Sequence, residues 1–415
     1  MANAPRSSRL RILLSEGSST SAREAITALG LNGHHVEICD PDPHCLGRFS
    51  RFVRKFHRCP RLRHNPAEYL SFVLDLIARR PFDVLLPIHE QGLLFAKARE
   101  RVEPRIAVAL PSFDSYRQVI SKAGFSRLLT ELALPHPNMR LLTMPAELQA
   151  IDRFPYVIKT SIGTASRGTW IVHDHAGLER ALRELTEADA FSDEILVQDF
   201  VPGAVEHAQA VFARGSLLAS HAYRQLAAGA GGGPARKESV RRPLVHEHLA
   251  RIGARLAWHG ALSLDYIWQE AAEIPVYIDC NPRLVEPMNA FWSGLDLTQL
   301  LIDVSRGTAP PPAAHSRAGI RTHLAMQALL GCAMRSGSRR DVLRELWLLV
   351  SRGGPYAGSR EELTPLRLDW FSIVPLLMTM LFLLVNPRLA HELPKRGWGA
   401  HLLSPQTIRM IETMS

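Results

Sequence analysis

The chain has 415 residues and a formal net charge of +9, a length that corresponds to roughly two to four compact domains. Hydrophobic residues make up 46% of it and charged residues 21%, which excludes a wholly disordered chain and a polytopic membrane protein. The basic charge comes almost wholly from dispersed arginines, and no RNP, zinc-finger or helix-turn-helix signature accompanies them. We therefore expect no nucleic-acid partner.

The cysteines and the first residues indicate a cytoplasmic protein. The five cysteines are odd in number and irregularly spaced, which excludes a disulfide scaffold and a CxxC zinc module and suits a reducing compartment. They are Cys39, Cys45, Cys59, Cys280 and Cys332. The first apolar run, residues 12–14, is too short for the core of a signal peptide.

Residues 9–115 predict an open α/β domain built on a parallel sheet, because strands alternate with helices. The predicted order is a strand at 10–15, a helix at 20–31, a strand at 35–39, a helix at 66–80 and a strand at 84–88. The first turn, residues 16–20, lacks the GxGxxG spacing that a dinucleotide pyrophosphate requires. This argues against a nicotinamide-dependent oxidoreductase.

After Pro111 the pattern changes to runs of strands interrupted by single helices, which predicts α+β architecture with antiparallel pairing. Helices are predicted at 121–132, 176–187 and 244–259, and strands at 156–160, 170–173, 194–200, 206–213, 217–223, 261–269 and 276–280. We divide this part into residues 116–200 and 201–308. A Pro-rich stretch at 309–314 ends it.

Two carboxylates and an amide predict a metal site. Side chains alternate along a strand, so Asp279 and Asn281 point to one face, and a hairpin would bring Asp265 beside them. Such hard oxygen donors suit Mg²⁺, which keeps positions for phosphate oxygens. The same spacing also fits two exposed acids on a solvated sheet face.

A lysine and a glycine-containing turn follow one another at residues 159–168. Glycines let backbone N–H groups converge on a phosphate, and Lys159 adds a positive charge. The segment lacks the Gly-Lys-Ser/Thr of a Walker motif, and a strand follows where that motif has a helix. Taken alone, such a segment is more often an ordinary hairpin turn.

Residues 197–203 form a strand that runs into Pro202 and Gly203, with Glu206 shortly after. An extended segment of this kind exposes backbone groups that can pair with an adenine edge, and a later acid can accept ribose hydroxyls. By itself the pattern is also that of any strand end.

The order of these three signals resembles an ATP-grasp carboxylate–amine ligase, close to the carbamoyl-phosphate-synthetase-like and D-alanine–D-alanine-ligase-like branches. The resemblance extends over residues 121–301. It is carried by the segments Ser-Lys at 121–122, Phe-Pro-Tyr-Val-Ile-Lys at 154–159, the turn at 163–168, Gln198 to Gly203 with Glu206, Leu-Asp-Tyr at 264–266 and Tyr-Ile-Asp-Cys-Asn-Pro-Arg at 277–283.

The resemblance implies a pre-ATP-grasp domain followed by an ATP-grasp fold of two α+β subdomains, and it implies site residues by position. Nucleotide binding is implied for Lys122, Lys159, Gly163, Thr164, Ala165, Ser166, Arg167, Gly168, Gln198, Asp199, Phe200, Val201 and Glu206. Metal binding is implied for Asp265, Asp279 and Asn281, and contact with the transferred phosphoryl group or substrate for Arg283, Lys159 and, more loosely, Arg236 and Lys237. Two departures are Lys-Thr at 159–160, where the family often has Lys-Pro, and Asp279 in place of the commoner glutamate.

The implied cofactors are ATP and Mg²⁺, with Mn²⁺ as an alternative, and the implied substrates are a small-molecule carboxylate and an amine. The carboxylate attacks the γ-phosphate, and an amine then displaces phosphate from the acylphosphate to form an amide. We expect Cys280 to be a core residue, because it alternates away from the metal face. His89 and Glu90 follow a predicted strand and are candidates for the acceptor pocket, or for a plain surface loop.

Residues 315–415 lie outside the resemblance and predict a mostly helical extension. Its apolar segment, residues 370–385, carries no charge and is followed by basic residues. As a helix it would extend about 24 Å, short of the ~30 Å of bilayer hydrocarbon. It fits a buried hairpin or a subunit contact in a homo-oligomer, a monotopic membrane contact or, least well, a span. The rival to the ligase function is a catalytically silent nucleotide-binding regulator or membrane-associated adaptor.

Overall fold

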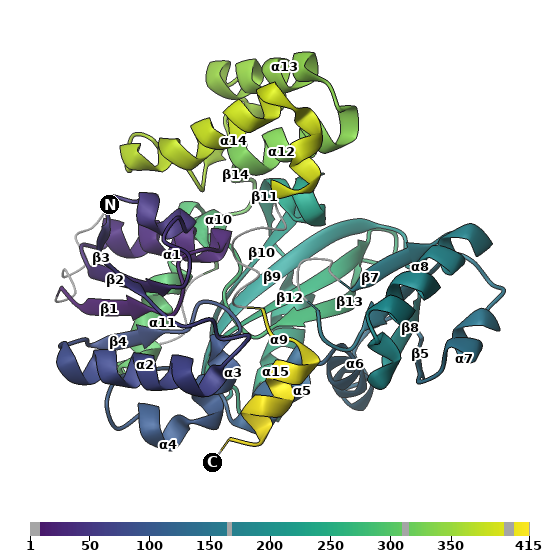
Figure 1. The fold of residues 1–415 in the computed structure, drawn as a ribbon, viewed down its shortest axis with the longest axis horizontal. Helices are drawn as coiled ribbons and strands as arrows, with labels where there is room; N and C mark the ends of the chain where they lie inside the picture. Colours follow the sequence, from purple (N-terminus) through teal and green to yellow (C-terminus); the bar gives the residue numbers. More distant parts are fainter. Residues whose placement is uncertain (1–8, 164–167, 309–314, 394–401, 415) are drawn as a thin grey trace.

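The protein is described here by a computed structural model that covers residues 9–163, 168–308, 315–393 and 402–414. The described residues form three sheets with helices around them, and a helical region lies at one end of the molecule (Figure 1). Mixed α/β architecture with one parallel sheet and antiparallel sheets is therefore confirmed. The Pro-rich stretch at 309–314 lies outside the described residues.

The N-terminal region is a parallel four-stranded sheet with the strand order β3-β2-β1-β4. Its elements are β1 (Arg11–Leu14), α1 (Thr20–Leu31), β2 (His35–Asp40), β3 (Val53–Arg58), α2 (Pro66–Arg79), β4 (Val84–Leu86), α3 (Gln91–Lys97), α4 (Arg99–Val102) and α5 (Phe113–Ile120). Helix α1 begins at Ser19, whose side chain accepts a hydrogen bond from the amide of Ala22. Hydrophobic periodicity does not predict β3, because this edge strand has the polar sequence VRKFHR.

A second four-stranded sheet, with the order β5-β8-β6-β7, is antiparallel. Its region contains α6 (Lys122–Glu131), β5 (Met139–Leu142), α7 (Pro145–Gln149), β6 (Tyr156–Thr160), β7 (Thr169–Val172), α8 (His175–Glu187) and β8 (Ile195–Asp199). Leu178 and Leu185 of α8 pack on Ile158 of β6, so this sheet has its own small core. We refer to this unit as the small subdomain.

The largest sheet has seven strands in the order β13-β12-β9-β10-β11-β14-β15. It is built from β9 (Ala204–Ala213), β10 (Ser216–Ala228), β11 (Pro234–Val240), β12 (Gly260–Gln269), β13 (Ile274–Asn281), β14 (Arg321–His323) and β15 (Arg360–Glu361), and its region also holds α9 (Pro243–Leu256), α10 (Met288–Trp292) and α11 (Leu297–Ser305). Helix α9 covers one face, where Leu249 packs near Leu264. The other face lies toward α10, α11 and the N-terminal region, as Val211 and Ala261 show.

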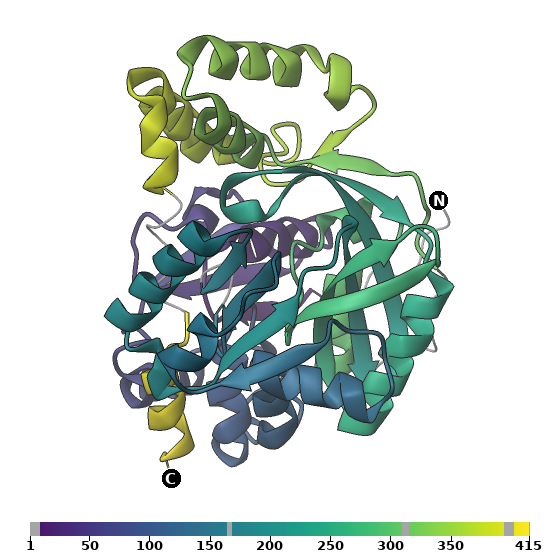
Figure 2. The same cartoon turned by 90° about the vertical axis from the view of Figure 1, so that its right-hand side faces the viewer.

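The C-terminal region is mostly helical, as predicted, but it also extends the largest sheet. Its described elements are α12 (Ala325–Ser336), α13 (Arg339–Ser351), α14 (Ile373–Val385) and α15 (Pro405–Glu412), besides β14 and β15. Short 3-10 helices occur throughout the chain: η1 (Leu46–Phe49), η2 (Ala190–Ser192), η3 (Ala230–Gly232), η4 (Gly354–Tyr356), η5 (Trp370–Ser372) and η6 (Pro387–His391). Helices α12, α13 and α14 form the separate layer seen at the top of Figures 1 and 2, whereas α15 packs against α2 and α3.

None of the described helices has both the length and the apolar character needed to cross a bilayer. Helix α14, which contains most of the apolar segment 370–385, has 13 residues. It is only partly packed, because Leu383 is buried whereas Leu381 is 60% exposed. The apolar segment therefore forms a helix that is buried only on the side of Leu383, and a buried hairpin does not account for its exposed side.

Candidate functional site

The three predicted metal ligands lie together on two neighbouring strands. In the antiparallel pairing of β12 with β13, Asp265 is directly opposite Asp279, and Ser263 is opposite Asn281. Because opposite residues share a face and alternate residues return to it, the side chains of Asp279 and Asn281 lie on the face of Asp265. The two carboxylate side chains are 25% and 30% exposed. This is a set of hard oxygen donors with access to solvent, which suits Mg²⁺.

The two carboxyl groups differ in their electrostatic environment. Burial opposes ionisation of Asp265, but His207, whose Nδ1 lies 2.7 Å from Oδ1, outweighs it and holds the pKa of this carboxyl below its usual value. Burial raises the pKa of Asp279, although the positive charges of Lys122 and Lys159 oppose this rise. A bound cation would favour the ionised form of both groups.

The two predicted phosphate-binding lysines reach this sheet from the small subdomain. Lys122 is the first residue of α6, where a positive charge is unfavourable to the helix dipole. Its Nζ donates a hydrogen bond to the carbonyl of Gly163 at 3.0 Å and lies 3.9 Å from Oδ2 of Asp279. Lys159 of β6 donates from Nζ to the carbonyl of Ile278 at 2.6 Å. Both ammonium groups therefore converge on β13 beside Asp279.

The ammonium group of Lys159 is nearly buried, and this changes its acidity. Burial lowers its pKa to about 8, with the nearby charge of Lys122 acting in the same direction and Asp279 in the opposite one. A bound polyphosphate would supply negative charge and restore the cationic form. The two lysines are thus partnered mainly by carbonyl groups, which leaves their charge only partly neutralised.

Arg283, the residue expected to steady a phosphoryl group, follows β13 and is 7% exposed. Its guanidinium donates weakly to the side chains of Asn281 and Ser21, at 3.4 and 3.5 Å. Ser21 belongs to α1, so the guanidinium lies between the metal-ligand strand and the N-terminal region. Cys280 is buried, as predicted from its alternation.

The glycine-containing turn connects β6 to β7, and only its ends are described. Gly168 has a φ of +71°, and a Cβ there would lie 2.1 Å from Oγ1 of Thr160, so a glycine is required. The amide of Thr160 donates to the carbonyl of Gly168 and closes the turn. The predicted phosphate contacts of Thr164, Ala165, Ser166 and Arg167 lie outside the described residues.

The predicted adenine hinge joins the small subdomain to the largest sheet. Gln198 and Asp199 are the last residues of β8, and Asp199 accepts a hydrogen bond from the side chain of Asn138 at 2.8 Å. Phe200 and Val201 lie beyond the strand, immediately before Pro202. The backbone of Gln198 is already paired within the sheet, so Phe200 and Val201 are the better candidates for contact with a base.

Glu206, the predicted ribose-binding acid, is buried among side chains of the protein itself. Its side chain is fully buried on the α9 face of the sheet, opposite to the face of Asp265, because Asp265 pairs with His207 rather than with Glu206. Its oxygens accept hydrogen bonds from Arg224 at 3.0 Å, Arg242 at 2.7 and 2.8 Å, and Tyr266 at 3.0 Å. These contacts favour a structural role for this carboxylate, and its contact with a ribose stays a prediction.

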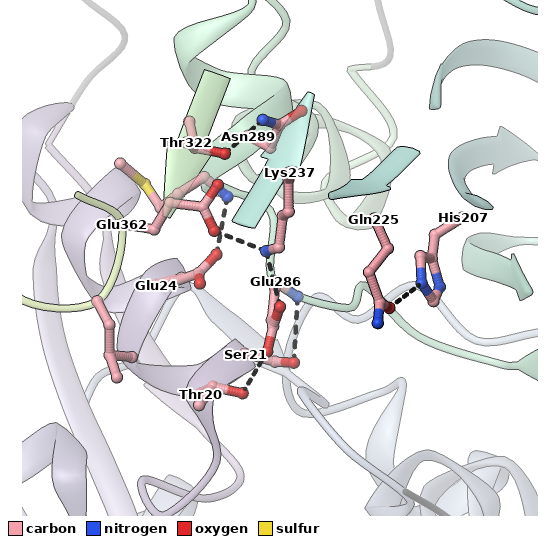
Figure 3. A network of polar contacts seen from close by, with 12 residues as sticks. Thr20, Ser21, Glu24, His207, Gln225, Lys237, Glu286, Asn289, Thr322 and Glu362 are labelled. Atoms are coloured by element: carbon pink, nitrogen blue, oxygen red, sulfur yellow. Dashed lines mark hydrogen bonds and ion pairs between the residues drawn. The ribbon is translucent and has the colours of Figure 1, made fainter. Parts of the chain in front are cut away.

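Lys237 also differs from its prediction as a substrate-contacting residue. It is fully buried in β11, and its Nζ lies 2.6 Å from Glu362 and 2.7 Å from Glu286 (Figure 3). Burial disfavours its charge, but these carboxylates outweigh this effect and raise its pKa well above its usual value. The ammonium group is thus occupied by protein carboxylates. The guanidinium of Arg236, the looser candidate beside it, donates to the carbonyl of Pro355.

Glu24 of α1 completes this second group of charges, and carboxylate oxygens of Glu24, Glu286 and Glu362 lie within 4.8 Å of one another. A metal ion is not needed there, because the ammonium group of Lys237 already provides a cation. Glu286 could have been suspected from its position shortly after Arg283, whereas Glu24 and Glu362 carry no local signal. His207, which orients Asp265, was detectable only from the alternation along β9.

The predicted acceptor-pocket residues His89 and Glu90 are buried, at 3% and 4% exposure. The backbone amide of Leu403 donates to Oε2 of Glu90 at 2.6 Å. The C-terminal segment before α15 therefore covers this edge of the N-terminal sheet.

A cavity of about 600 Å³ borders the site without containing it. It lies between α5, α6 and α15 and reaches Ser161 and Ile162, at the start of the glycine-containing turn. Neither of the two site lysines and none of the three metal-ligand candidates lines it. We therefore do not assign it to the nucleotide.

No protein-family model matches the chain. Over 292 residues it is 24% identical to the carbamoyl phosphate synthase large chain of Rubrobacter xylanophilus, an alignment that covers 64% of this chain and 27% of that protein. The chain thus spans much less than the full length of this relative.

Several solved structures are similar to this chain in their fold. The biotin carboxylase domain of 2-oxoglutarate carboxylase from Hydrogenobacter thermophilus, in complex with MgADP, ADP and bicarbonate, has a TM-score of 0.58 at 16% identity and covers 75% of this chain and 73% of that one. The L-amino acid ligase of Bacillus licheniformis has a TM-score of 0.54 at 16% identity and covers 72% and 75%. These proteins are ATP-grasp enzymes. The resemblance is therefore confirmed for the fold, which is that of the ATP-grasp superfamily.

Proposed function

We propose that this protein is an ATP- and Mg²⁺-dependent ligase that activates a substrate carboxylate as an acylphosphate and couples it to an amine. The observation that carries the proposal is the convergence of two incompletely neutralised lysines on Asp279, with Asp265 opposite it. Cations beside a solvent-accessible pair of carboxylates form a site for a metal-bound polyphosphate. The likeness to a biotin carboxylase domain with bound MgADP and to an L-amino acid ligase supports the nucleotide and the reaction class.

The position of each residue suggests its role in binding the cation, the phosphates or the base. Asp265, Asp279 and Asn281 would hold the divalent cation, which supplies neutralisation of phosphate charge when bound. Lys122 and Lys159 would bind the phosphate oxygens, and the hinge at Phe200 and Val201 would bind the base.

Positioning and charge stabilisation then account for the first step, in which a carboxylate oxygen bonds to the γ-phosphorus and ADP leaves. Arg283, which lies beside Asn281, would stabilise the transferred phosphoryl group. In the second step the amine nitrogen bonds to the acyl carbon, phosphate leaves, and the nitrogen loses a proton.

The experiment is an ATP-dependent phosphate-release assay on the full chain with pooled carboxylic acids and amines. Asp279→Ala should reduce turnover at least a hundredfold, because it removes a ligand of the cation, while the melting temperature stays close to that of the wild type. Asp75→Ala is the matched control, because Asp75 is an exposed surface aspartate. Full activity of Asp279→Ala would sink the assignment. Tight ATP binding without turnover with any acceptor would instead identify the nucleotide-binding regulator.

A further inference from the structure

Exposed apolar side chains are concentrated in the C-terminal region. Ten of the fourteen large hydrophobic side chains that are exposed in the described part of the chain lie between residues 343 and 385. They are Leu343, Trp347, Val350, Leu366, Trp370, Leu377, Met378, Leu381, Phe382 and Val385. We call these ten residues the C-terminal apolar face. Single exposed hydrophobic residues are ordinary, but a concentration of this kind marks an interaction surface.

Eight of these ten residues lie on two neighbouring helices and follow helical spacing there. On α13 they recur as Leu343, Trp347 and Val350, whereas Val342 is buried in the core of this region and Leu349 packs against that core. On α14 they occupy 377, 378, 381, 382 and 385, whereas Leu383 is buried. The two helices are in contact, and the side chain of Arg339 at the start of α13 donates to the carbonyl of Val385 at the end of α14. Both lie in the layer remote from the candidate site (Figures 1 and 2).

The surface around the apolar face is basic. All eight arginines between residues 335 and 393, a fully described stretch, are exposed. In the same stretch the only acidic side chain in the exposed class is Glu392. Of the others, Glu345 accepts a hydrogen bond from Tyr356, and Asp369 is buried against Arg23. The C-terminal region therefore exposes positive charge as well as apolar side chains.

We propose that the C-terminal apolar face docks on the surface of an anionic phospholipid bilayer. An apolar helix face with arginines around it and exposed tryptophans, here Trp347 at 66% and Trp370 at 65%, has the composition of an interfacial membrane contact. The 13 residues of α14 would extend only about 20 Å as a helix, so the contact lies in the interface and does not cross it. This inference is independent of the ligase function.

A second copy of the chain is the competing occupant, and the charges argue against it. A two-fold contact brings the same patch of both copies together, so the arginines of one copy would face those of the other. An anionic bilayer surface would instead attract all of these arginines.

The test is flotation of the full chain with vesicles of phosphatidylcholine alone and with vesicles containing phosphatidylglycerol at about a third of the lipid. We expect binding to the anionic vesicles, weakened at high salt because arginine contributes through charge. Each arginine near such a surface contributes roughly a fivefold factor to binding, so Arg340→Glu with Arg344→Glu should lower the partition coefficient at least tenfold. Trp347→Ser with Leu381→Ser should also lower the partition coefficient at least tenfold, because it removes apolar contact with the bilayer.

Met144→Ser with Ile171→Ser is the matched control, because both residues are exposed apolar residues of the small subdomain. It should leave vesicle binding unchanged, and circular dichroism should show that all variants fold. No flotation with anionic vesicles would overturn the proposal, as would equal binding by the wild type and both C-terminal variants. The wild type could instead self-associate without binding vesicles. If Trp347→Ser with Leu381→Ser abolishes that self-association, the face contacts a second copy of the chain.

Discussion

Two groups of charges are built on the same sheet, and they differ in how completely the protein neutralises them. At the candidate site, Lys122 lies 3.9 Å from Asp279, Lys159 contacts a carbonyl, and the carboxylates remain a quarter or more exposed. Around Lys237, by contrast, ammonium and carboxylate lie 2.6 to 2.7 Å apart, and Lys237 and Glu362 have no exposed side-chain surface. Figure 3 shows this closed group together with Gln225 and His207. The Nδ1 atom of His207 in turn contacts Asp265.

The difference separates a site that needs a ligand from a site that is already complete. Incomplete neutralisation beside solvent is typical of a binding site for a charged molecule. The closed group instead joins three parts of the chain, because Glu24 belongs to the N-terminal region, Glu286 follows β13, and Glu362 directly follows β15. We expect substitutions in the open group to change nucleotide binding and substitutions in the closed group to change stability.

The largest effect is expected for Lys237→Met. Removing the ammonium group leaves three carboxylates buried without a cation, which should lower the free energy of unfolding by about 3–5 kcal/mol. Urea unfolding of the purified chain measures this. Lys55→Met, at an exposed lysine of β3, is the control and should change stability by less than about 0.5 kcal/mol. A loss below about 1 kcal/mol for Lys237→Met would show that the closed group does not hold the three regions together.

The open group could be predicted from sequence because local rules determine it. The period of two along β13 places Asp279 and Asn281 on one face, and a short hairpin brings Asp265 opposite. The closed group could not be predicted, because Glu24 and Glu362 are separated from Lys237 by more than a hundred residues of chain. Only tertiary packing brings them together.

Prediction of the fold from the sequence is limited in the same way. Strands with apolar runs, such as β1, β4 and β12, were predicted close to their observed bounds. Strand β11, with the largely polar sequence PARKESV, is missing from the predicted strands, yet pairing with β10 and β14 makes it a strand. The burial of Glu206 could not be predicted for a related reason, because the face of the sheet on which its side chain lies depends on the register of β9 with β12.

Glu206→Gln separates the buried structural role from the ribose contact expected from the sequence. Loss of the carboxylate charge weakens the contacts with Arg224 and Arg242, and hydrogen bonds to charged groups contribute about 1.5–3 kcal/mol each. Because both arginines are partly exposed, we expect the free energy of unfolding to fall by about 2 kcal/mol in total. The dissociation constant for ATP, measured by calorimetry at a temperature where the variant is folded, should change less than about threefold. A tenfold weaker affinity with unchanged stability would restore the ribose contact.

The pH dependence of ATP binding tests the open group directly, with a smaller effect. The pKa of Lys159 is lowered to about 8 in the free protein, so its ammonium group loses its proton as the pH rises from 7 to 9. Bound polyphosphate favours the charged lysine, so binding above pH 8 requires uptake of a proton. We therefore expect the dissociation constant for ATP to rise by about tenfold between pH 7 and pH 9.

Lys159→Met keeps an unbranched side chain one atom shorter and without the titrating group. The ATP affinity of this variant should be weaker and nearly independent of pH over this range. Lys97→Met, at the end of α3 and away from the site, should keep the slope of the wild type. If the profiles of the wild type and Lys159→Met run parallel, the proton is taken up elsewhere and Lys159 does not contact the phosphates. If only the wild type and the control show this pH dependence, Lys159 is the group that takes up the proton. The bound nucleotide then neutralises the charge of this lysine.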